Sequence, residues 1–241
     1  MKYLLEIWRQ ESKEAKGCYR TYLYETDSDT VTVAAALSEL NGRDVLRDTN
    51  GAETDKIVWE CSCLQKKCGA CAMLINGKPC LACDVKLSGC KNGRLKLEPL
   101  RKFPIVADLM VNRQIIFDDL IQMQLWSGSE FFADDRNNNV MYEASRCLQC
   151  GCCLEVCPNF AAGEGFFGMS AMVPSSRLLA GIKDSSSDRL RKQYGKVITD
   201  GCGKSLACRN ICPAGIDIEG LMARSNAAVL WRWIFDRRKK Q

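Results

Sequence analysis

The chain has 241 residues, and none of them is a histidine. Without histidine the protein cannot form a Ser-His or Cys-His nucleophile, a His-ligated haem, a histidine-containing zinc site or a Rieske-type iron–sulfur centre. Long hydrophobic runs are missing too, because no stretch approaches the roughly 18 unbroken apolar residues of a membrane-spanning helix. The first ten residues are interrupted by Glu6 and Arg9, so they predict neither a signal peptide nor an organellar presequence. We therefore expect a cytoplasmic protein.

Positive charge is only slightly in excess of negative charge. The net charge is +5, and much of it falls in the C-terminal run from Arg237 to Lys240. We interpret this run either as a solvated tail or as a contact with anionic lipid headgroups or a membrane partner. No basic stripe interleaved with aromatic residues is present, so the sequence does not indicate nucleic-acid binding.

Cysteine, in contrast, is abundant, with sixteen in the chain. A disulfide framework would need a secretory context and cysteines spread along the chain, whereas these lie two or three residues apart in groups. Clustered thiols in a reducing compartment typically bind metal, so the groups are candidate metal or iron–sulfur sites.

The first group consists of Cys63, Cys68 and Cys71, followed by Cys83. Its C-x4-C-x2-C spacing with a later fourth cysteine is the plant-type pattern of a [2Fe–2S] cluster. Gly69 would let the backbone approach the cluster closely, and the fourth thiolate would come from the far strand of a hairpin. A zinc knuckle is the alternative, but zinc usually takes two pairs of ligands and not three from one loop.

The second group consists of Cys147, Cys150, Cys153 and Cys157, and Pro158 follows it directly. This is the C-x2-C-x2-C-x3-C-P pattern of bacterial ferredoxins, in which the fourth cysteine binds the other cluster when two are present. The first three cysteines are therefore predicted to hold one cubane, while the fourth reaches across to a second cluster.

The third group consists of Cys202, Cys208 and Cys212, and Pro213 follows it. Compared with the bacterial pattern, Ser205 stands where the second cysteine is expected. A serine hydroxyl is a poor iron ligand unless it is deprotonated, so we expect one corner of this cluster to be vacant. The alternative is that Ser205 caps a turn and that water or the serine oxygen retains a fourth iron.

Exchange of the fourth cysteines assigns ligands to both clusters. Four thiolates are predicted to hold a [4Fe–4S] cluster, namely those of Cys147, Cys150, Cys153 and Cys212. Three thiolates remain and predict a [3Fe–4S] cluster, namely those of Cys157, Cys202 and Cys208. Five cysteines fall outside the three sets. Cys61 and Cys80 lie close enough to the first set to compete as ligands, but neither fits its spacing, and Cys152 breaks the spacing of the second set and is expected to be a bystander. Cys18 and Cys90 are expected to be structural or incidental.

The remaining sequence predicts an α+β protein of two domains, residues 1–100 and 101–241. The first domain is expected to be mostly β, with strands over 3–9 and 19–26 and a hairpin turning at Asn76-Gly77. The hairpin strands are predicted over 72–75 and 80–87. A helix is predicted over 31–40, with Thr30 or Thr32 as its cap and Gly42 past its end.

The second domain is expected to be all-α. Apolar residues at helical spacing predict a first helix over 105–124. Further helices are predicted over 178–182, 187–194 and 218–235. The polar, Asn-rich stretch 132–139 is predicted to be a loop.

The order and spacing of the three cysteine groups resemble those of the iron–sulfur subunits of succinate dehydrogenase and fumarate reductase. The resemblance covers nearly the whole chain, and it includes the segment from Phe103 to Leu109, the Leu81-Ala82-Cys83 step and both Cys-Pro pairs. It implies a plant-type ferredoxin domain with a β-grasp fold, followed by a bacterial-type two-cluster ferredoxin domain.

This resemblance also implies an electron relay. Electrons would pass between a flavoprotein subunit that carries FAD and a quinone at a membrane anchor, of cytochrome b type or another quinone-binding type. They would travel through the [2Fe–2S], [4Fe–4S] and [3Fe–4S] clusters in that order. The chain itself would perform no carbon chemistry, and it would lie peripherally on the cytoplasmic face of a bacterial membrane.

Several positions depart from the family's best-known pattern. Many members carry Arg-Ser before the first cysteine, whereas this chain has Glu60-Cys61-Ser62, which predicts less positive surroundings and a lower potential for the first cluster. Ala162 and Gly203 stand where quinone-reducing succinate dehydrogenases carry tryptophan and histidine. Asn226, with Arg224 nearby, stands where members tend to carry lysine. These departures favour menaquinone or another acceptor over ubiquinone.

Two other classes remain open from the sequence. One is an electron-transfer subunit of a different flavin dehydrogenase or of a soluble, thiol-linked fumarate reductase. The other is a structural zinc protein or assembly scaffold, which would be colourless, whereas iron–sulfur proteins are brown.

Overall fold

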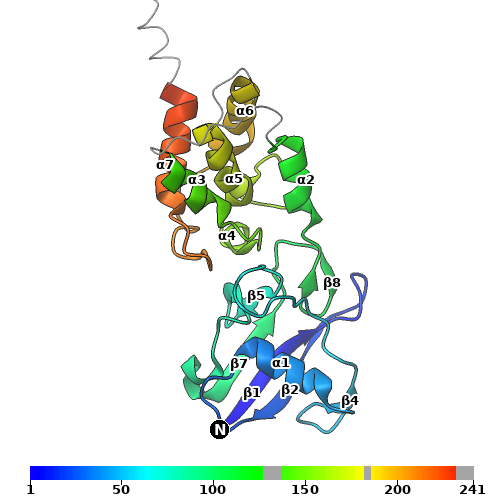
Figure 1. Ribbon diagram of the computed structural model, residues 1–241. Coiled ribbons are helices and arrows are strands. Elements are labelled where there is room, and N and C mark those ends of the chain that lie inside the picture. Colours follow the sequence, from blue (N-terminus) through cyan, green and yellow to red (C-terminus); the bar gives the residue numbers. More distant parts are fainter. Residues whose placement is uncertain (127–136, 182–185, 232–241) are drawn as a thin grey trace, which may run out of the picture. The chain divides into compact units, whose positions relative to one another are not determined.

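The computed structural model describes residues 1–126, 137–181 and 186–231, which are coloured along the chain in Figure 1. The chain forms two compact units, Met1–Arg113 and Gln114–Gln241. The first unit holds the described strands and the second is built from helices, so the predicted α+β class is confirmed.

A five-stranded mixed sheet forms the first unit. Its order is β2 (Cys18–Glu25), β1 (Lys2–Arg9), β7 (Arg94–Glu98), β5 (Ala72–Ile75) and β6 (Lys78–Leu81). β1 pairs antiparallel with β2 and parallel with β7. Tyr3, Leu5 and Ile7 alternate along β1 and are buried, as the period of two in a strand requires when one face packs on a core.

The helix α1 (Val33–Gly42) lies against this sheet (Figure 1). Thr32 is its N-cap, and the Thr32 side chain accepts a hydrogen bond from the Ala35 N–H at 3.2 Å, which satisfies one of the free donors of the first turn. Leu37 and Leu40 are fully buried on its inner face. The predicted helix and the Thr32 cap are confirmed, but Gly42 is the last helical residue and does not lie beyond the helix.

Short elements complete this unit. They are β3 (Leu46–Arg47), β4 (Glu53–Thr54) and the 3-10 turns η1 (Leu87–Gly89) and η2 (Lys91–Gly93). The predicted turn at Asn76-Gly77 is confirmed, since both residues have positive φ (52° and 76°), as a tight hairpin turn requires. The second hairpin strand ends at Leu81, earlier than predicted.

The helix predicted over 105–124 is wrong in its first half. Residues there form a small hairpin of β8 (Ile105–Ala107) and β9 (Met110–Val111), and the helix α2 begins only at Gln114 and ends at Gln122. Asp108 at the turn has a φ of 45° and is 3% exposed. Its carboxylate accepts hydrogen bonds from the N–H groups of Gln10 and Val58, both at 2.8 Å, and it pairs with Arg9 at 3.1 Å.

Because of these contacts, the boundary between the two units lies later in the chain than the predicted domain boundary. We expected the second domain to begin at residue 101, but Asp108 binds the end of β1 and the segment before the first cysteine group. The backbone adds two more bonds, from the Asp108 N–H to Gln10 and from the Leu109 N–H to Val58. The hairpin therefore belongs to the first unit, and the division falls between Arg113 and Gln114.

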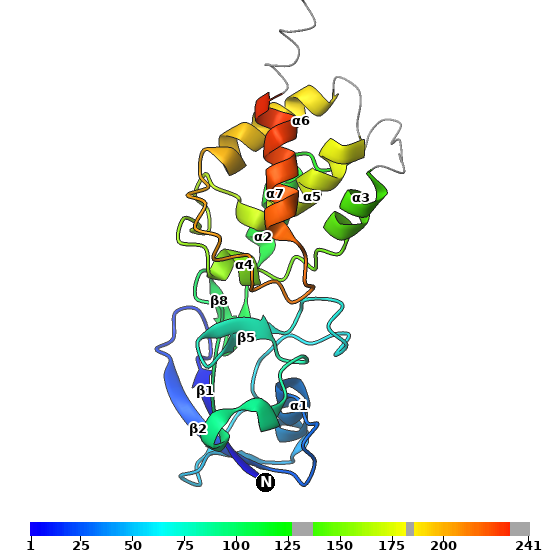
Figure 2. The ribbon, with the colours of Figure 1, turned by 90° about the vertical axis from the view of Figure 1, so that its left-hand side faces the viewer.

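The central helix of the second unit is α5 (Gly168–Gly181), which contacts every other described α-helix of the unit (Figure 2). The others are α2, α3 (Asn138–Ser145), α4 (Cys152–Glu155), α6 (Ser186–Tyr194) and α7 (Ile218–Asn226). Two π-helical turns follow α6 and α7, namely η3 (Gly195–Thr199) and η4 (Ala227–Trp231).

The helices predicted in this unit are confirmed with different bounds. The segment 178–181 is only the last part of α5, and 218–231 is helical as far as the structure describes it. Of the predicted loop over 132–139, residues 132–136 lie outside the described residues, and Asn138 already begins α3. No helix in the described ranges is both long enough and apolar enough to cross a membrane.

The buried Asp108 carboxylate generates a stability prediction. Asp108→Ala removes one partner of a buried ion pair and leaves two backbone donors without their acceptor, so it should lower the free energy of unfolding by about 3 kcal/mol. Urea unfolding of the anaerobically purified holoprotein measures the change. The matched control is the exposed Asp44→Ala, which should change stability by no more than ~0.5 kcal/mol. Equal losses in the two variants would contradict this role of Asp108.

Candidate iron–sulfur sites

The loop that carries Cys63, Cys68 and Cys71 directs backbone N–H groups at its own sulfur atoms. Gln65 and Lys67 donate to the Sγ of Cys63, both at 3.3 Å, and Ala70 donates to the Sγ of Cys68 at 3.5 Å. The loop has positive φ at Leu64 (52°), Lys66 (60°) and Gly69 (76°). Successive N–H groups that converge in this way form a concave surface suited to an anion.

The hairpin brings the fourth cysteine of this set to the loop. Cys71 precedes β5, Cys83 follows β6, and the Ala82 N–H donates to the Cys71 carbonyl at 3.0 Å, which extends the strand pairing. The Lys66 N–H donates to the Sγ of Cys83 at 3.3 Å. The loop and the hairpin thus bring the thiols of these four cysteines close to one another.

Electrostatics differ within this set. The N–H groups of Gln65 and Lys67 lower the pKa of the Cys63 thiol to about 7. Burial, together with the neighbouring thiols of Cys83 and Cys68, raises the pKa of Cys71 to about 12. A buried thiol of this kind becomes a thiolate at neutral pH only when a nearby cation compensates the negative charge. Iron bound to the sulfur would supply that positive charge.

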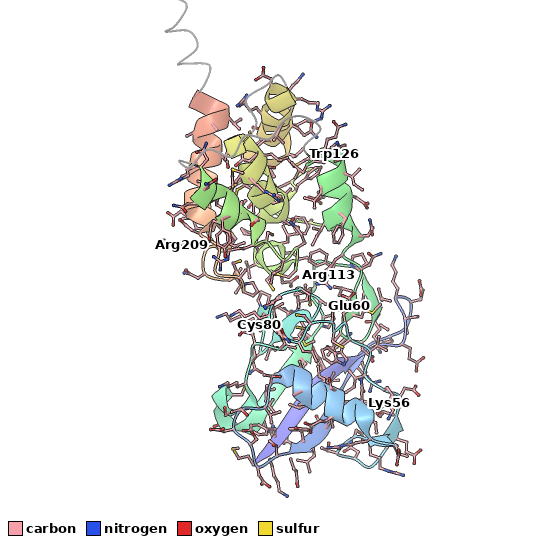
Figure 3. All side chains as sticks on the ribbon, viewed as in Figure 1. Lys56, Glu60, Cys80, Arg113, Trp126 and Arg209 are labelled. Atoms are coloured by element: carbon pink, nitrogen blue, oxygen red, sulfur yellow. The ribbon has the colours of Figure 1, made fainter. Side chains whose placement is uncertain are left out.

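Arg113, which lies next to Glu60 in Figure 3, binds this loop and was not among the residues that the sequence singled out. The Arg113 guanidinium donates to the carbonyls of Gly69 (2.9 Å) and Ala70 (3.0 Å) and forms an ion pair with Glu60. Glu60, which we expect to make the surroundings of the first cluster less positive, thus has a cationic partner in Arg113. An arginine beyond the predicted domain boundary gives no sequence signal, because its partner lies more than fifty positions earlier in the chain.

A second set of thiols lines one cavity in the helical unit. Cys147, Cys150 and Cys153 come from the loop before α4 and from α4 itself, and Cys212 comes from the segment before α7. The rest of the lining is mainly apolar and includes Leu148, Met169, Val173, Ile216 and Ile218. The two segments that carry the second and third cysteine groups thus meet around one site, as the exchange of fourth cysteines predicts.

Burial dominates the electrostatics of this cavity. It raises the pKa of Cys147 to about 11, with additional contributions from Cys150 and Cys212. The pKa of Cys153 lies well above its ordinary value, again mainly through burial and then through Cys150, Cys147 and Cys212. In these apolar surroundings, four thiolates are more favourable when they bind a positively charged iron–sulfur core than when they are free. The cavity therefore suits an iron–sulfur cluster.

Arg146 holds the two segments of this site together. Its guanidinium donates to the Ala214 carbonyl, two residues after Cys212, and pairs with Glu143 on α3 at 2.8 Å. Glu143 in turn accepts a hydrogen bond from the Asp217 N–H at 2.9 Å, at the start of α7. This network fixes the Cys-Pro segment next to the loop that begins at Cys147.

The third set is also assembled in this unit. Cys208 is buried, and its pKa is raised by burial and then by its interaction with Cys157 and Cys202. The Cys202 Sγ lies 4.0 Å from the Met222 Sδ on α7. Ser205 is exposed, and its Oγ accepts from the Ala207 N–H at 3.5 Å, so the hydroxyl faces its own turn.

No three Cys, Asp or Glu side chains in the described ranges converge closely enough to ligate a single metal ion. The thiols of Cys147, Cys150, Cys153 and Cys212 instead line the cavity described above.

Comparison with known proteins agrees with this geometry. Residues 4–118 match the model of the 2Fe-2S iron-sulfur cluster binding domain, and residues 143–216 match that of the 4Fe-4S dicluster domain. The succinate dehydrogenase iron-sulfur subunit of Bacillus subtilis is 31% identical over 207 residues, which cover 81% of this chain and 80% of the relative. The chain belongs to the family of succinate dehydrogenase and fumarate reductase iron–sulfur subunits.

Other relatives carry the second name of the family. The fumarate reductase iron-sulfur subunit of Wolinella succinogenes is 29% identical over 171 residues, covering 65% of this chain and 70% of the relative. A chain in the structure of the Mycobacterium smegmatis Sdh1 complex in the apo form shares the fold, with a TM-score of 0.76 and 20% identity. The match covers 93% of this chain and 95% of that one.

Five cysteines of this family member lie outside the three sets. Cys152 is fully buried in α4, whereas Cys18 and Cys61 are exposed. Cys80 (labelled in Figure 3) and Cys90 are half-buried, and their thiols lie near the carbonyls of Lys78 and Lys86. That none of the five is a cluster ligand stays a prediction.

Arg113 generates a prediction for the first cluster. Arg113→Met leaves the Glu60 charge uncompensated and frees the two loop carbonyls, so it should lower the [2Fe–2S] midpoint potential. We expect a change on the order of tenfold in the reduction equilibrium, which is ~59 mV for one electron. EPR-monitored redox titration measures it. The double variant Glu60→Gln/Arg113→Met should recover much of the loss, and an unchanged potential in Arg113→Met would contradict the role.

Proposed function

We propose that this chain relays single electrons between an FAD-bearing flavoprotein subunit and a quinone at a membrane anchor. It would act as the iron–sulfur subunit of a succinate dehydrogenase or fumarate reductase. The observation that carries the proposal is the cavity around Cys147, Cys150, Cys153 and Cys212, where two distant chain segments contribute thiols to one site. Family membership supports the assignment.

The ligand sets are part of this proposal. We assign the [2Fe–2S] cluster to Cys63, Cys68, Cys71 and Cys83, and the [4Fe–4S] cluster to Cys147, Cys150, Cys153 and Cys212. The [3Fe–4S] cluster is assigned to Cys157, Cys202 and Cys208. The exposed Ser205, whose hydroxyl accepts from the Ala207 N–H, supports a vacant fourth corner in that cluster.

Iron–sulfur clusters, when bound, supply reversible one-electron storage. The residues of this chain then have three tasks. They hold the clusters at fixed positions, they exclude water from them, and they place N–H groups and charges that stabilise one oxidation state over the other. No residue of the chain is assigned to carbon chemistry.

An apolar surface supports docking to a partner subunit. Phe117 (49% exposed) and Ile121 (60%) are one helical turn apart on α2, and Trp126 (56%) follows the helix. Large side chains that are grouped and exposed in this way typically become buried in an interface. This surface belongs to the second unit, and we propose that the second unit faces the membrane anchor on the cytoplasmic side. We propose that the flavoprotein docks on the first unit, near the Cys63 loop.

The surroundings of the third cluster support a quinone other than ubiquinone, with menaquinone favoured. At Gly203, a Cβ would lie 3.0 Å from the side-chain amide of Asn159, so Asn159 occupies the space that a larger side chain would need. Asn159 is held there by a hydrogen bond to the Gly201 carbonyl at 2.8 Å. Asn226, at the family's lysine position, accepts from the Tyr194 hydroxyl at 3.0 Å.

The metal content tests the cluster assignment. Clusters with two, four and three irons predict about nine irons per chain and negligible zinc in anaerobically purified, brown protein. Iron and zinc analysis by mass spectrometry measures both. A colourless protein with stoichiometric zinc would instead establish the zinc-scaffold alternative.

Ser205→Cys tests the vacant corner. A fourth thiolate should recruit a fourth iron, so the [3Fe–4S] EPR signal of the oxidised protein should disappear and the potential of this cluster should fall. Electron exchange with quinone should slow, while the flavin half-reaction should stay intact. The matched control, Ser38→Cys on the exposed face of α1, should leave the signal unchanged. If Ser205→Cys also leaves it unchanged, position 205 is not at the vacant corner of the cluster.

A further inference from the structure

The side-chain amide of Gln149 lies between a cysteine of the [4Fe–4S] set and the central helix of its unit. Gln149 Nε2 donates to the Sγ of Cys147 at 3.4 Å and to the carbonyl of Ser170 at 3.1 Å. An amide nitrogen has two hydrogens, and these two bonds use both. The hydrogen bond to the Ser170 carbonyl therefore fixes the orientation of the amide in which its other hydrogen points at the Cys147 sulfur.

The Ser170 carbonyl is available for this bond because of a proline. In an α-helix, a carbonyl accepts from the N–H four residues later, and for Ser170 that residue is Pro174, which lies inside α5 and has no N–H. Ser170 is 1% exposed, so water does not readily satisfy the free carbonyl. Gln149 supplies the donor that the proline removes.

Two features of Gln149 work against the stability that its two hydrogen bonds supply. Its φ is 51°, in the left-handed region that non-glycine residues rarely adopt. Its Oε1 atom is buried and has no hydrogen-bond partner in the part of the chain that the structure describes. Both features destabilise the folded state, and such costs persist where a residue has a functional task.

We propose that Gln149 is a positioning residue that raises the midpoint potential of the [4Fe–4S] cluster through its hydrogen bond to the Cys147 sulfur, and that Pro174 keeps this bond in place. The proposal depends on the [4Fe–4S] ligand set proposed above. Reduction adds negative charge that spreads onto the ligand sulfurs, so an N–H donor stabilises the reduced form more than the oxidised form. The apolar lining of the cavity strengthens this effect, because little water competes for the sulfur.

Gln149→Leu tests the inference in the anaerobically purified complex. Leucine has a similar volume but no donor, so the variant should retain the [4Fe–4S] EPR spectrum and shift the reduction equilibrium about tenfold toward the oxidised form. That change corresponds to a potential lower by about 59 mV for one electron. The matched control is Gln122→Leu, at an exposed position of α2, which should leave the potential unchanged.

Pro174→Ala provides a second test that changes neither the cysteines nor the amide. Alanine restores an N–H at position 174, which competes for the Ser170 carbonyl and releases one of the two bonds that hold Gln149. The potential should shift in the same direction as in Gln149→Leu but less, while the thermal midpoint holds or rises because a helical hydrogen bond is gained. A purely structural role of Pro174 would leave the potential unchanged.

The outcomes separate this inference from the proposed function. An intact [4Fe–4S] signal with an unchanged potential in both variants overturns the inference and leaves the cluster assignment standing. If Cys147→Ser retains the wild-type [4Fe–4S] signature and potential, the proposed ligand set fails, and the inference fails with it. A lowered potential in Gln149→Leu, with the Gln122→Leu control unchanged, supports the inference.

Discussion

Thiolates that are held out of water impose the constraint on which the rest of this structure depends. Burial raises the pKa values of Cys71, Cys147, Cys153 and Cys208, so in a metal-free chain these thiols would stay protonated. Iron binds the thiolate, and binding therefore releases protons and stabilises the folded chain at the same time. Because each proposed site takes thiols from separate segments, we expect formation of the clusters to stabilise the folded units.

The three sites surround their sulfur atoms with different groups. Around Cys63 the loop itself supplies several backbone N–H groups, at the cost of left-handed conformations at Leu64 and Lys66. Around Cys147 a side-chain amide donates to the sulfur from a mainly apolar lining. At the third site, the Cys202 sulfur lies next to the thioether of Met222, a soft and weakly polar group. Since N–H donors to sulfur raise cluster potentials, differences of this kind give a relay its sequence of potentials.

Much of this arrangement could be predicted from spacing, because cluster ligation is local along the chain. The C-x4-C-x2-C loop, the Asn76-Gly77 turn and the Thr32 cap each depend on a few consecutive residues, and the structure contains all three local features. The segment 105–113 could not be predicted in this way. Its apolar spacing suits a helix, but Asp108 gains more from the N–H groups of Gln10 and Val58 than it would from a helical turn. Tertiary contacts of this kind override local propensity.

The residues that contact the cysteine loops could not be predicted from the sequence either, because their partners lie far away along the chain. Arg113 compensates Glu60, and Pro174 leaves a carbonyl free for Gln149, yet neither pair is close in sequence. In each case a residue outside the cysteine groups decides which donor reaches a ligand or its loop. A proline in the middle of a helix ordinarily reads as a kink or a defect. Here the Ser170 carbonyl, which lacks a helical donor because of Pro174, accepts one hydrogen of the Gln149 amide, and the Cys147 sulfur accepts the other. With the proposed ligand set, the helix bond that is lost at Pro174 is therefore coupled to the electrostatics of the [4Fe–4S] cluster.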